Sequence, residues 1–351
     1  MIGVVCLNPA LDVTHHVPAV DWAGVNRPDE VHARPGGKGL NVARTLHALG
    51  TEVLVMGLAG GTTGQAVTAA LAALAVPSAF TWVRGETRRT FTVVDGRTGD
   101  AALFNEPGPR IAADGYAEFR ARYLSVLTGC AAVVLSGSLP PGLPAGCYAE
   151  LTAMAAAAGV PVLLDAHGEA LRLGAAAAPA IVKQNLAELE MFAGRTLSGP
   201  AGSGPAGSGP DGTGTAAPRP AGTGPADPDR RAVAAAAGEL RAAGPQAVVV
   251  SLGPDGLHAD TPDGGWEAVP PAVVTGNATG AGDAAAAGLA QGLALGQPWE
   301  ERLRHAVALG TAAALAPVAG EFSPADYATA RAGVTVTRAD DGAGAALGEA
   351  G

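Results

Sequence analysis

Lysine is almost absent from this 351-residue chain. Only Lys38 and Lys183 are lysine among the 22 basic residues, and all the others are arginine. Aromatic residues make up only 4% of the chain, so alanine, valine and leucine must form most of the core. A coding bias toward arginine, alanine, glycine and proline accounts for the overall excess of arginine over lysine. It does not explain why lysine remains at these two positions.

Other absences exclude whole classes of protein. The net charge of −10 argues against a nucleic-acid-binding protein, which needs a basic face. The three cysteines show no CxxC spacing, so neither a disulfide framework nor a zinc site is expected. The chain starts without the basic residues and apolar run of a signal peptide and has no apolar stretch long enough to cross a membrane. We therefore expect a cytoplasmic protein that binds neither nucleic acid nor membrane.

Short apolar runs and helical periodicities alternate along most of the sequence. The length predicts one large domain, here placed at residues 1–337. The alternation predicts an α/β fold, with a mostly parallel sheet flanked by helices on both faces. Expected strands are 2–7, 53–58, 132–135, 160–165, 180–182 and 247–252, followed by a hairpin at 257–268. Expected helices are 40–49, 66–74, 116–127, 145–158, 186–192, 231–243, 281–295 and 299–315.

Three regions depart from this alternation. Short strands with alternating polar residues, at 14–17, 30–33, 80–83, 91–94 and 101–104, predict a small separate sheet built approximately within 12–35 and 79–105. Of the 30 residues at 199–228, 9 are glycine and 7 are proline. Such a segment buries too little apolar surface to offset the entropy of ordering it, so we expect a disordered insertion there. Residues 338–351 are expected to form a flexible tail.

The strongest local motif runs from Gly276 to Asp283. Its glycine-rich turn opens an alanine-rich helix, so the backbone N–H groups of Gly280, Ala281 and Gly282 would point at one spot. A helix N-terminus carries partial positive charge, which suits an anion. Beside a bound phosphoryl group, Asp283 would accept the proton of an attacking hydroxyl. The structural alternative is an ordinary helix N-terminus with an acidic first turn.

A second glycine-rich turn precedes another expected helix. It consists of Gly36, Gly37, Lys38, Gly39 and, within the helix, Asn41. The spacing is not that of a P-loop, which needs Gly-x4-Gly-Lys-Ser/Thr. Glycines allow a ligand to approach the backbone closely, while the lysine offers charge and the asparagine an amide for hydroxyl groups. The alternative is a flexible turn with a solvated lysine.

The third motif holds the second lysine. Lys183 follows a short expected strand, and Asn185 and Glu188 have the spacing of a capping box for the next helix. A functional interpretation places Lys183 near nucleotide phosphates and the other two near hydrated Mg²⁺, which takes few carboxylate ligands. All three motifs follow expected strands at their carboxyl ends, where open α/β sheets bind ligands.

Taken together, these motifs resemble those of the ribokinase-like (PfkB-type) carbohydrate kinases. The matching stretches are 36–43, 277–288, 183–188 and 251–256. The resemblance implies an ATP-dependent kinase with Asp283 as base and an anion hole at Gly280–Gly282, with Mg²⁺ held through water by Glu188. For the substrates it implies two sets of residues. Asp12, Gly36, Gly37, Lys38, Asn41, Arg88 and Ser138 would bind the sugar and its phosphate, whereas Lys183, Asn185, Ser251, Gly253 and Gly256 would border the nucleotide.

Residues 8–12, 105–109 and 136–142 are similar to those of 1-phosphofructokinases and tagatose-6-phosphate kinases. The resemblance therefore implies phosphorylation of fructose 1-phosphate by ATP, with a tagatose-6-phosphate or fructose-6-phosphate kinase as the alternative. After Arg88 that subgroup often has Ile-Asn-Val-Lys, whereas this chain has Arg89, Thr90, Phe91 and Thr92, so Arg89 becomes the candidate for the missing charge. The family also implies a homodimer through the small sheet, which would act as a lid over the sugar. A catalytically silent sensor is disfavoured because Asp283 and Glu188 are both present.

Overall fold

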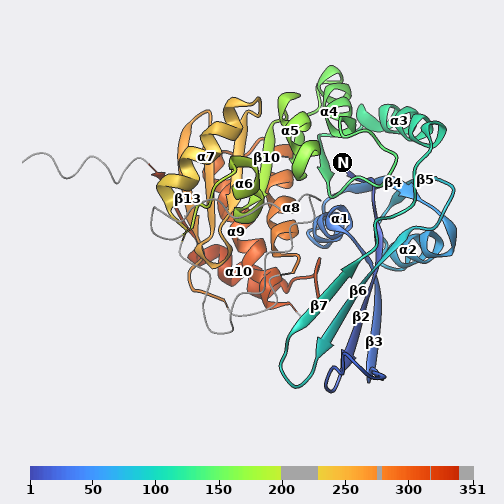
Figure 1. Cartoon of the computed structure of the whole chain (residues 1–351). Helices are drawn as coiled ribbons and strands as arrows, with labels where there is room; N and C mark the ends of the chain where they lie inside the picture. The colour runs from blue at the N-terminus through green and yellow to red at the C-terminus, as the bar shows by residue number, and fades with distance from the viewer. Residues whose placement is uncertain (199–227, 275–278, 317, 340–351) are drawn as a thin grey trace, which may run out of the picture.

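The structure is a computed structural model that describes residues 1–198, 228–274, 279–316 and 318–339. Two sheets form its framework (Figure 1). Within the described residues, none of the helices combines the length and apolar character needed to cross a bilayer.

The larger sheet has ten strands in the order β14-β13-β12-β11-β10-β9-β8-β1-β4-β5. From β11 to β5 all neighbouring strands are parallel, while β12, β13 and β14 add an antiparallel edge. The strands are β1 Ile2–Cys6, β4 Val53–Ala59, β5 Ser78–Trp82, β8 Ala132–Ser136, β9 Val162–Asp165, β10 Ile181–Asn185, β11 Ala247–Ser251, β12 Leu257–Thr261, β13 Gly264–Val269 and β14 Thr335–Arg338. This confirms the predicted α/β fold with a mostly parallel sheet.

Helices cover both faces of this sheet, as the apolar strands require. Successive residues of β1 show the arrangement, because Val4 packs into the core on one face and Val5 into the core on the other. On the Val4 face lie α1 Lys38–Ala48, α2 Gly61–Ala73, α8 Ala281–Ala294, α9 Trp299–Leu315 and α10 Pro324–Gly333. On the Val5 face lie α3 Ala113–Leu127, α4 Cys147–Ala157, α5 Gly168–Ala176, α6 Leu186–Ala193 and α7 Arg230–Ala242.

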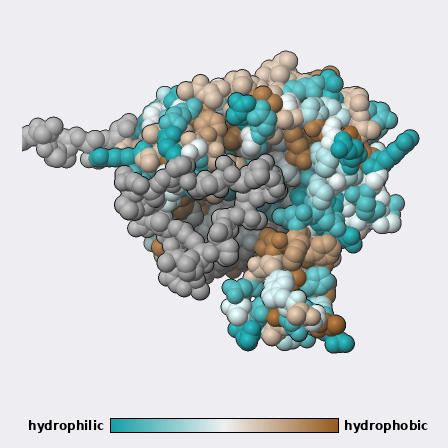
Figure 2. All heavy atoms as spheres, in the orientation of Figure 1, coloured by the Kyte–Doolittle hydropathy of each residue, from teal (hydrophilic) through white to brown (hydrophobic). Residues whose placement is uncertain are grey.

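The smaller sheet, called the lid below, has four strands in the order β3-β2-β6-β7. They are β2 Ala10–Val17, β3 Glu30–Gly36, β6 Arg88–Asp95 and β7 Ala101–Asn105. The lid extends away from the main body, and its surface mixes hydrophilic and hydrophobic side chains (Figures 1 and 2). The prediction that 80–83 belongs to the lid was wrong, because β5 pairs with β4 at the edge of the large sheet. Phe80 is buried in the main core, which explains this position.

Several other expectations need adjustment. Residues 199–227 of the expected insertion lie outside the described residues, and its last residue, Pro228, forms a β-bridge with Ser198. The expected tail begins too early, since Arg338 still pairs with Trp266 in β14, and 340–351 lie outside the described residues. Helices α5 and α10 and strand β14 were not among the elements expected from the sequence.

Candidate active site

A cleft of about 2190 Å³ runs along the carboxyl ends of the parallel strands, between the lid and the N-termini of α1 and α8. Both lysines line it, as do residues of all three glycine-rich or helix-capping motifs. The predicted convergence at this edge of the sheet is confirmed.

Asn8 joins the three segments whose sequences are similar to those of 1-phosphofructokinases and tagatose-6-phosphate kinases. Its Nδ2 donates to the Pro107 carbonyl and to Ser138 Oγ, both at 3.1 Å. Arg88 Nε donates to the Asn8 carbonyl at 3.1 Å, which orients the guanidinium at this wall of the cleft. Segments about 100 and 130 residues downstream of Asn8 therefore meet in one wall that carries Arg88 and Ser138.

Asp12 lies on the cleft side of β2. Its carboxylate accepts a 2.5 Å hydrogen bond from Thr90 Oγ1 on β6. Burial raises the pKa of Asp12 above its usual value, although the Thr90 hydrogen bond and Arg88 act in the opposite direction. Gly36 on β3 pairs with Ala10, two residues before Asp12, and a Cβ on Gly36 would overlap the Asp12 carboxylate in its present position. Gly37 has φ 96°, a conformation that favours glycine, at the residue that precedes α1.

The predicted base lies in the first turn of α8. Asp283 is only 8% exposed and accepts a 2.9 Å hydrogen bond from Asn41 Nδ2 on α1. Burial raises the pKa of Asp283 to about 6, with a contribution from the charge of Asp165, while the Asn41 hydrogen bond and the two lysines oppose the rise. This carboxyl group is therefore largely ionised at neutral pH and close to the pKa range that suits a general base.

The segment 280–282 begins α8 as expected for an anion hole. Gly280 has φ 85°, and a Cβ there would meet Ala319 at 2.7 Å, so only glycine fits. A Cβ on Gly282 would lie 2.9 Å from Lys183 Nζ. The start of the helix is thus open to close approach, with a lysine beside it. Residues 276–278 of the motif lie outside the described residues.

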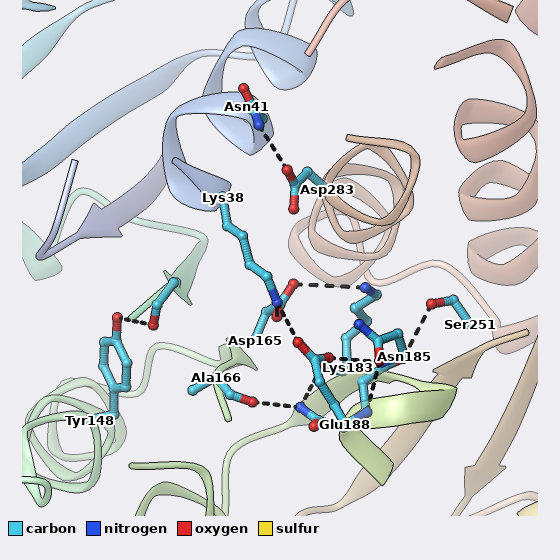
Figure 3. A network of polar contacts seen from close by, with 12 residues as sticks. Lys38, Asn41, Tyr148, Asp165, Ala166, Lys183, Asn185, Glu188, Ser251 and Asp283 are labelled. Carbon is cyan, nitrogen blue, oxygen red and sulfur yellow. Dashed lines mark hydrogen bonds and ion pairs between the residues drawn. The ribbon is translucent and has the colours of Figure 1, made fainter. Parts of the chain in front are cut away.

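Asp165, at the end of β9, lies between the two lysines and is fully buried (Figure 3). Lys38 Nζ donates to Asp165 Oδ1 at 2.9 Å and to Glu188 Oε1 at 2.7 Å, while Lys183 Nζ lies 3.8 Å from Asp165 Oδ2. Burial acts to raise the pKa of Asp165, but the charges of Lys38 and Lys183 outweigh it and hold the pKa below its usual value. Burial likewise acts to lower the pKa of Lys38, and Asp165 and Glu188 reverse this, so Lys38 stays an ammonium.

The capping box predicted at Asn185 is confirmed. Asn185 Oδ1 accepts from the Glu188 backbone N–H at 2.8 Å, and Glu188 Oε2 accepts from the Asn185 N–H at 2.9 Å. The structure places Lys183 and Asn185 on β10 itself rather than after the strand. Ser251 Oγ donates to the Gln184 carbonyl at 3.4 Å, and Gly253 and Gly256 follow in the same wall of the cleft.

Two carboxylates beside this end of the cleft suit a hydrated Mg²⁺. Asp165 and Glu188 do not line the cleft themselves but both accept from Lys38, which does. In the described part of the chain no three His, Cys, Asp or Glu side chains gather as a metal site. Mg²⁺ keeps several waters and needs only one or two carboxylates, together with substrate phosphates. Asp165 offers a buried Oδ2 that no donor in the described residues hydrogen-bonds, and Glu188 lies across the Lys38 ammonium from it. Asp165 and Glu188 would therefore hold the ion.

The structure adds to two interpretations of the sequence. The Lys38 ammonium lies on Asp165 and Glu188, and its binding of the sugar's phosphate stays a prediction. Arg89 is not among the described residues that line the cleft, since the alternation of side chains along β6 separates it from Arg88 and Thr90, which do. Its guanidinium pairs at 3.1 Å with Glu106, which lines the cleft. Asp165 was missed altogether. The available signal was a lone aspartate that ends a buried apolar strand next to the lysine motif.

Comparisons with known proteins agree with this geometry. The model of the pfkB family of carbohydrate kinases matches residues 4–326. Phosphofructokinase-2 from Escherichia coli, solved in complex with fructose-6-phosphate, superposes with a TM-score of 0.79 at 30% identity, covering 94% of this chain and 98% of that one. A putative phosphofructokinase from Staphylococcus aureus gives 0.74 at 26% identity, covering 96% and 98%. A possible 1-phosphofructokinase from Thermotoga maritima gives 0.78 at 24% identity, covering 96% and 99%, which shows a shared fold.

The expected ribokinase-like fold and enzyme class are thereby confirmed. Carbohydrate kinases of this family transfer a phosphoryl group from ATP, typically with Mg²⁺, to an alcohol group of the sugar. With a matching family model over most of its length and phosphofructokinases among its structural relatives, this chain belongs to the pfkB family of carbohydrate kinases and is a phosphosugar kinase.

Proposed function

We propose that this kinase phosphorylates fructose 1-phosphate with ATP to form fructose 1,6-bisphosphate. The observation that carries the proposal is the wall built around Asn8, where the three segments similar to 1-phosphofructokinases meet through the contacts to Pro107 and Ser138. Those contacts put Arg88 and Ser138 beside Asp12 in one cleft with Asp283.

In the proposed mechanism Asp12 and Asn41 bind sugar hydroxyls, and Arg88 with Ser138 holds the phosphate already present. The acceptor hydroxyl loses its proton to Asp283 as its oxygen attacks the γ-phosphorus of ATP, and the bond between that phosphorus and the bridging oxygen of the β-phosphate breaks to release ADP. The backbone N–H groups at the start of α8 stabilise the charge on the transferred group. Positioning and electrostatic stabilisation supply most of the rate in such transfers. Asp165 and Glu188 would hold Mg²⁺, which would neutralise negative charge on the phosphates of ATP.

For the nucleotide we propose the wall formed by Lys183, Asn185, Ser251, Gly253 and Gly256. Gly253 and Gly256 have φ of 63° and 88°, and a Cβ on Gly256 would overlap the Ala268 carbonyl. Because these glycines carry no side chains, they leave space for adenosine beside the end of β11. Lys183 is only 3% exposed and lies deeper in the cleft, toward the start of α8.

Fructose 6-phosphate is the second candidate substrate. It is favoured by the 30% identity to Escherichia coli phosphofructokinase-2, whose structure holds that sugar phosphate. Thr90 and Thr92 also stand where 1-phosphofructokinases often have asparagine and lysine, and both threonines line the cleft.

A substrate panel distinguishes the two candidates. Purified enzyme is assayed with ATP and Mg²⁺ against fructose 1-phosphate, fructose 6-phosphate and tagatose 6-phosphate, and kcat/KM is compared. The proposal expects the highest kcat/KM with fructose 1-phosphate. Equal or better turnover of fructose 6-phosphate would assign the enzyme to the second candidate.

We also propose a homodimer through the lid. Val31 and Phe104 of the lid strands are 52% and 51% exposed and do not line the cleft, whereas Leu103, the residue before Phe104 in β7, lines it. Large exposed apolar side chains on the face away from the cleft suit burial against a second copy of the chain. Light scattering after size exclusion tests this: wild type should have the mass of a dimer and Phe104→Asp that of a monomer, with Leu124→Asp on α3, an equally exposed leucine away from the lid, as the control. A monomeric wild type would contradict the proposal.

A further inference from the structure

The Lys38 ammonium lies on the two carboxylates that suit the divalent cation. It is 2.9 Å from Asp165 Oδ1 and 2.7 Å from Glu188 Oε1, and it bridges them (Figure 3). We propose that Lys38 and the divalent cation compete for Asp165 and Glu188, so that binding of the metal and release of this lysine are coupled. The inference rests on the proposed function only in taking these carboxylates as the ones that face the metal of the nucleotide.

Geometry makes the two positions exclusive. Mg²⁺ contacts its oxygens at about 2.0–2.1 Å. An ion bound to Glu188 Oε1 would therefore lie within a few ångström of the Lys38 ammonium, whether its Asp165 ligand is Oδ1 or the Oδ2 that has no hydrogen-bond donor in the described residues. Two cations that close together repel strongly in a buried site. The other oxygen of Glu188, Oε2, already accepts the capping-box hydrogen bond from the Asn185 N–H, so Oε1 is the oxygen that Lys38 and the metal would share.

Lys38 is able to leave, whereas Lys183 is not. The Lys38 side chain is 32% exposed and begins at the first residue of α1, on a flexible four-carbon stem. It lines the same cleft as Arg88 and Ser138, so an anionic phosphate of the substrate offers it another partner. Lys183 is buried and stays 3.8 Å from Asp165, so the buried carboxylate keeps one cationic neighbour when Lys38 moves.

The competition links the two ends of the cleft. A sugar phosphate that draws Lys38 away frees Asp165 and Glu188 for the metal. By thermodynamic reciprocity the metal then strengthens binding of the sugar phosphate by the same factor. Lys38 is thus a positioning residue: it contacts Asp165 and Glu188 in the absence of substrates and leaves them when the sugar phosphate and the metal of the nucleotide are bound.

The test measures Mn²⁺ binding to the full-length enzyme without nucleotide, by electron paramagnetic resonance of free Mn²⁺ at constant ionic strength. Lys38→Met and Lys38→Gln should bind Mn²⁺ about tenfold or more tighter than wild type, within the range usual for coupled sites. Arg88→Met is the matched control, since it removes one positive charge from the same cleft, while the Arg88 guanidinium hydrogen-bonds to the Asn8 and Glu106 carbonyls and not to Asp165 or Glu188 in the described structure. Asp165→Asn should lose Mn²⁺ binding. Thermal melts check that each variant is folded.

Equal Mn²⁺ affinity in wild type and both Lys38 variants overturns the proposal, as does a gain no larger than that of Arg88→Met. A second arm adds fructose 1-phosphate or fructose 6-phosphate. Either sugar phosphate, if it is a substrate, should tighten Mn²⁺ binding to wild type but leave Lys38→Met unchanged. A tightening of equal size in Lys38→Met refutes the link through Lys38, and so does the absence of tightening in wild type with a sugar phosphate that the enzyme is shown to phosphorylate. If neither sugar phosphate is phosphorylated, the proposed function is refuted, while tighter Mn²⁺ binding by the Lys38 variants still supports the competition.

Discussion

Replacing Asp283 with asparagine tests the chemistry of the site most directly. The amide has nearly the same shape as the carboxyl group and can still accept the 2.9 Å hydrogen bond from Asn41, so the packing at the start of α8 should survive. What is lost is the proton acceptor. A positioned general base contributes about 10²–10⁴ in rate, equivalent to about 3–5 kcal/mol of barrier. We therefore expect kcat with fructose 1-phosphate to fall at least a hundredfold while KM changes little.

The same group fixes the pH dependence. Its pKa is raised from 3.8 to about 6, which amounts to about 3 kcal/mol against the buried anion. The carboxylate is the active form, so kcat/KM should be constant above pH 7 and fall tenfold per pH unit below about pH 6. Asn41→Leu removes the hydrogen bond that favours the Asp283 carboxylate, so the acidic limb of the pH profile, where kcat/KM falls, should move to higher pH in that variant. Thr92→Val, which changes a lid residue of the cleft, should leave this acidic limb unchanged.

Initial rates in a coupled assay for ADP, from pH 5 to 8, give both quantities. A loss of less than tenfold in kcat for Asp283→Asn would refute the assignment of the base. So would a wild-type limb near pH 4, because that would mean a solvated carboxyl group at this position. A limb at the same pH in wild type and Asn41→Leu would show that another group titrates.

Three further variants probe the surroundings of the site. Lys183→Arg keeps the charge but brings a wide planar guanidinium to a position where the lysine is only 3% exposed, so kcat at saturating substrates should fall about tenfold or more. A thermal melt of the variant shows whether the loss comes from unfolding. Gly36→Ala places a Cβ on the Asp12 carboxylate and should raise KM for the sugar phosphate about tenfold with kcat nearly kept, as loss of a charged hydrogen bond predicts; an unchanged KM would remove Asp12 from the sugar site. Glu321→Gln weakens the 2.5 Å contact that ties Arg34 of the lid to the main body, so hydrogen exchange in β3 should become faster than in wild type, and equal rates would contradict this role.

The glycine-rich turns were predictable because each combines local signals. Gly280 and Gly37 adopt the positive φ that favours glycine, and Asp283 and Lys38 follow immediately in the first turn of a helix. The capping box at Asn185 was equally visible, since both of its partners lie within four residues of sequence. Such features depend on the backbone conformation of a few neighbouring residues, which the sequence specifies directly.

The contacts that cross the fold were not predictable in the same way. Phe80 has the polar neighbours of a lid strand, but pairing between β4 and β5 places it in the main core. Asp165 ends a strand that reads as ordinary core, and its importance comes from Lys38, more than a hundred residues earlier in the chain. Pairings of this kind are set by the order of strands in the sheet, and no local pattern carries that order.

The scarcity of lysine gains a physical explanation from this arrangement. Lys38 and Lys183 are the only lysines in the chain, and both ammonium groups lie within 4 Å of the same buried carboxylate. Asp165 has room for two compact point charges because each approaches a different oxygen. A guanidinium would engage both oxygens at once in its planar fork and exclude the second cation. A chain that uses arginine almost everywhere else therefore keeps lysine where two positive charges must share one aspartate and one of them must be able to leave.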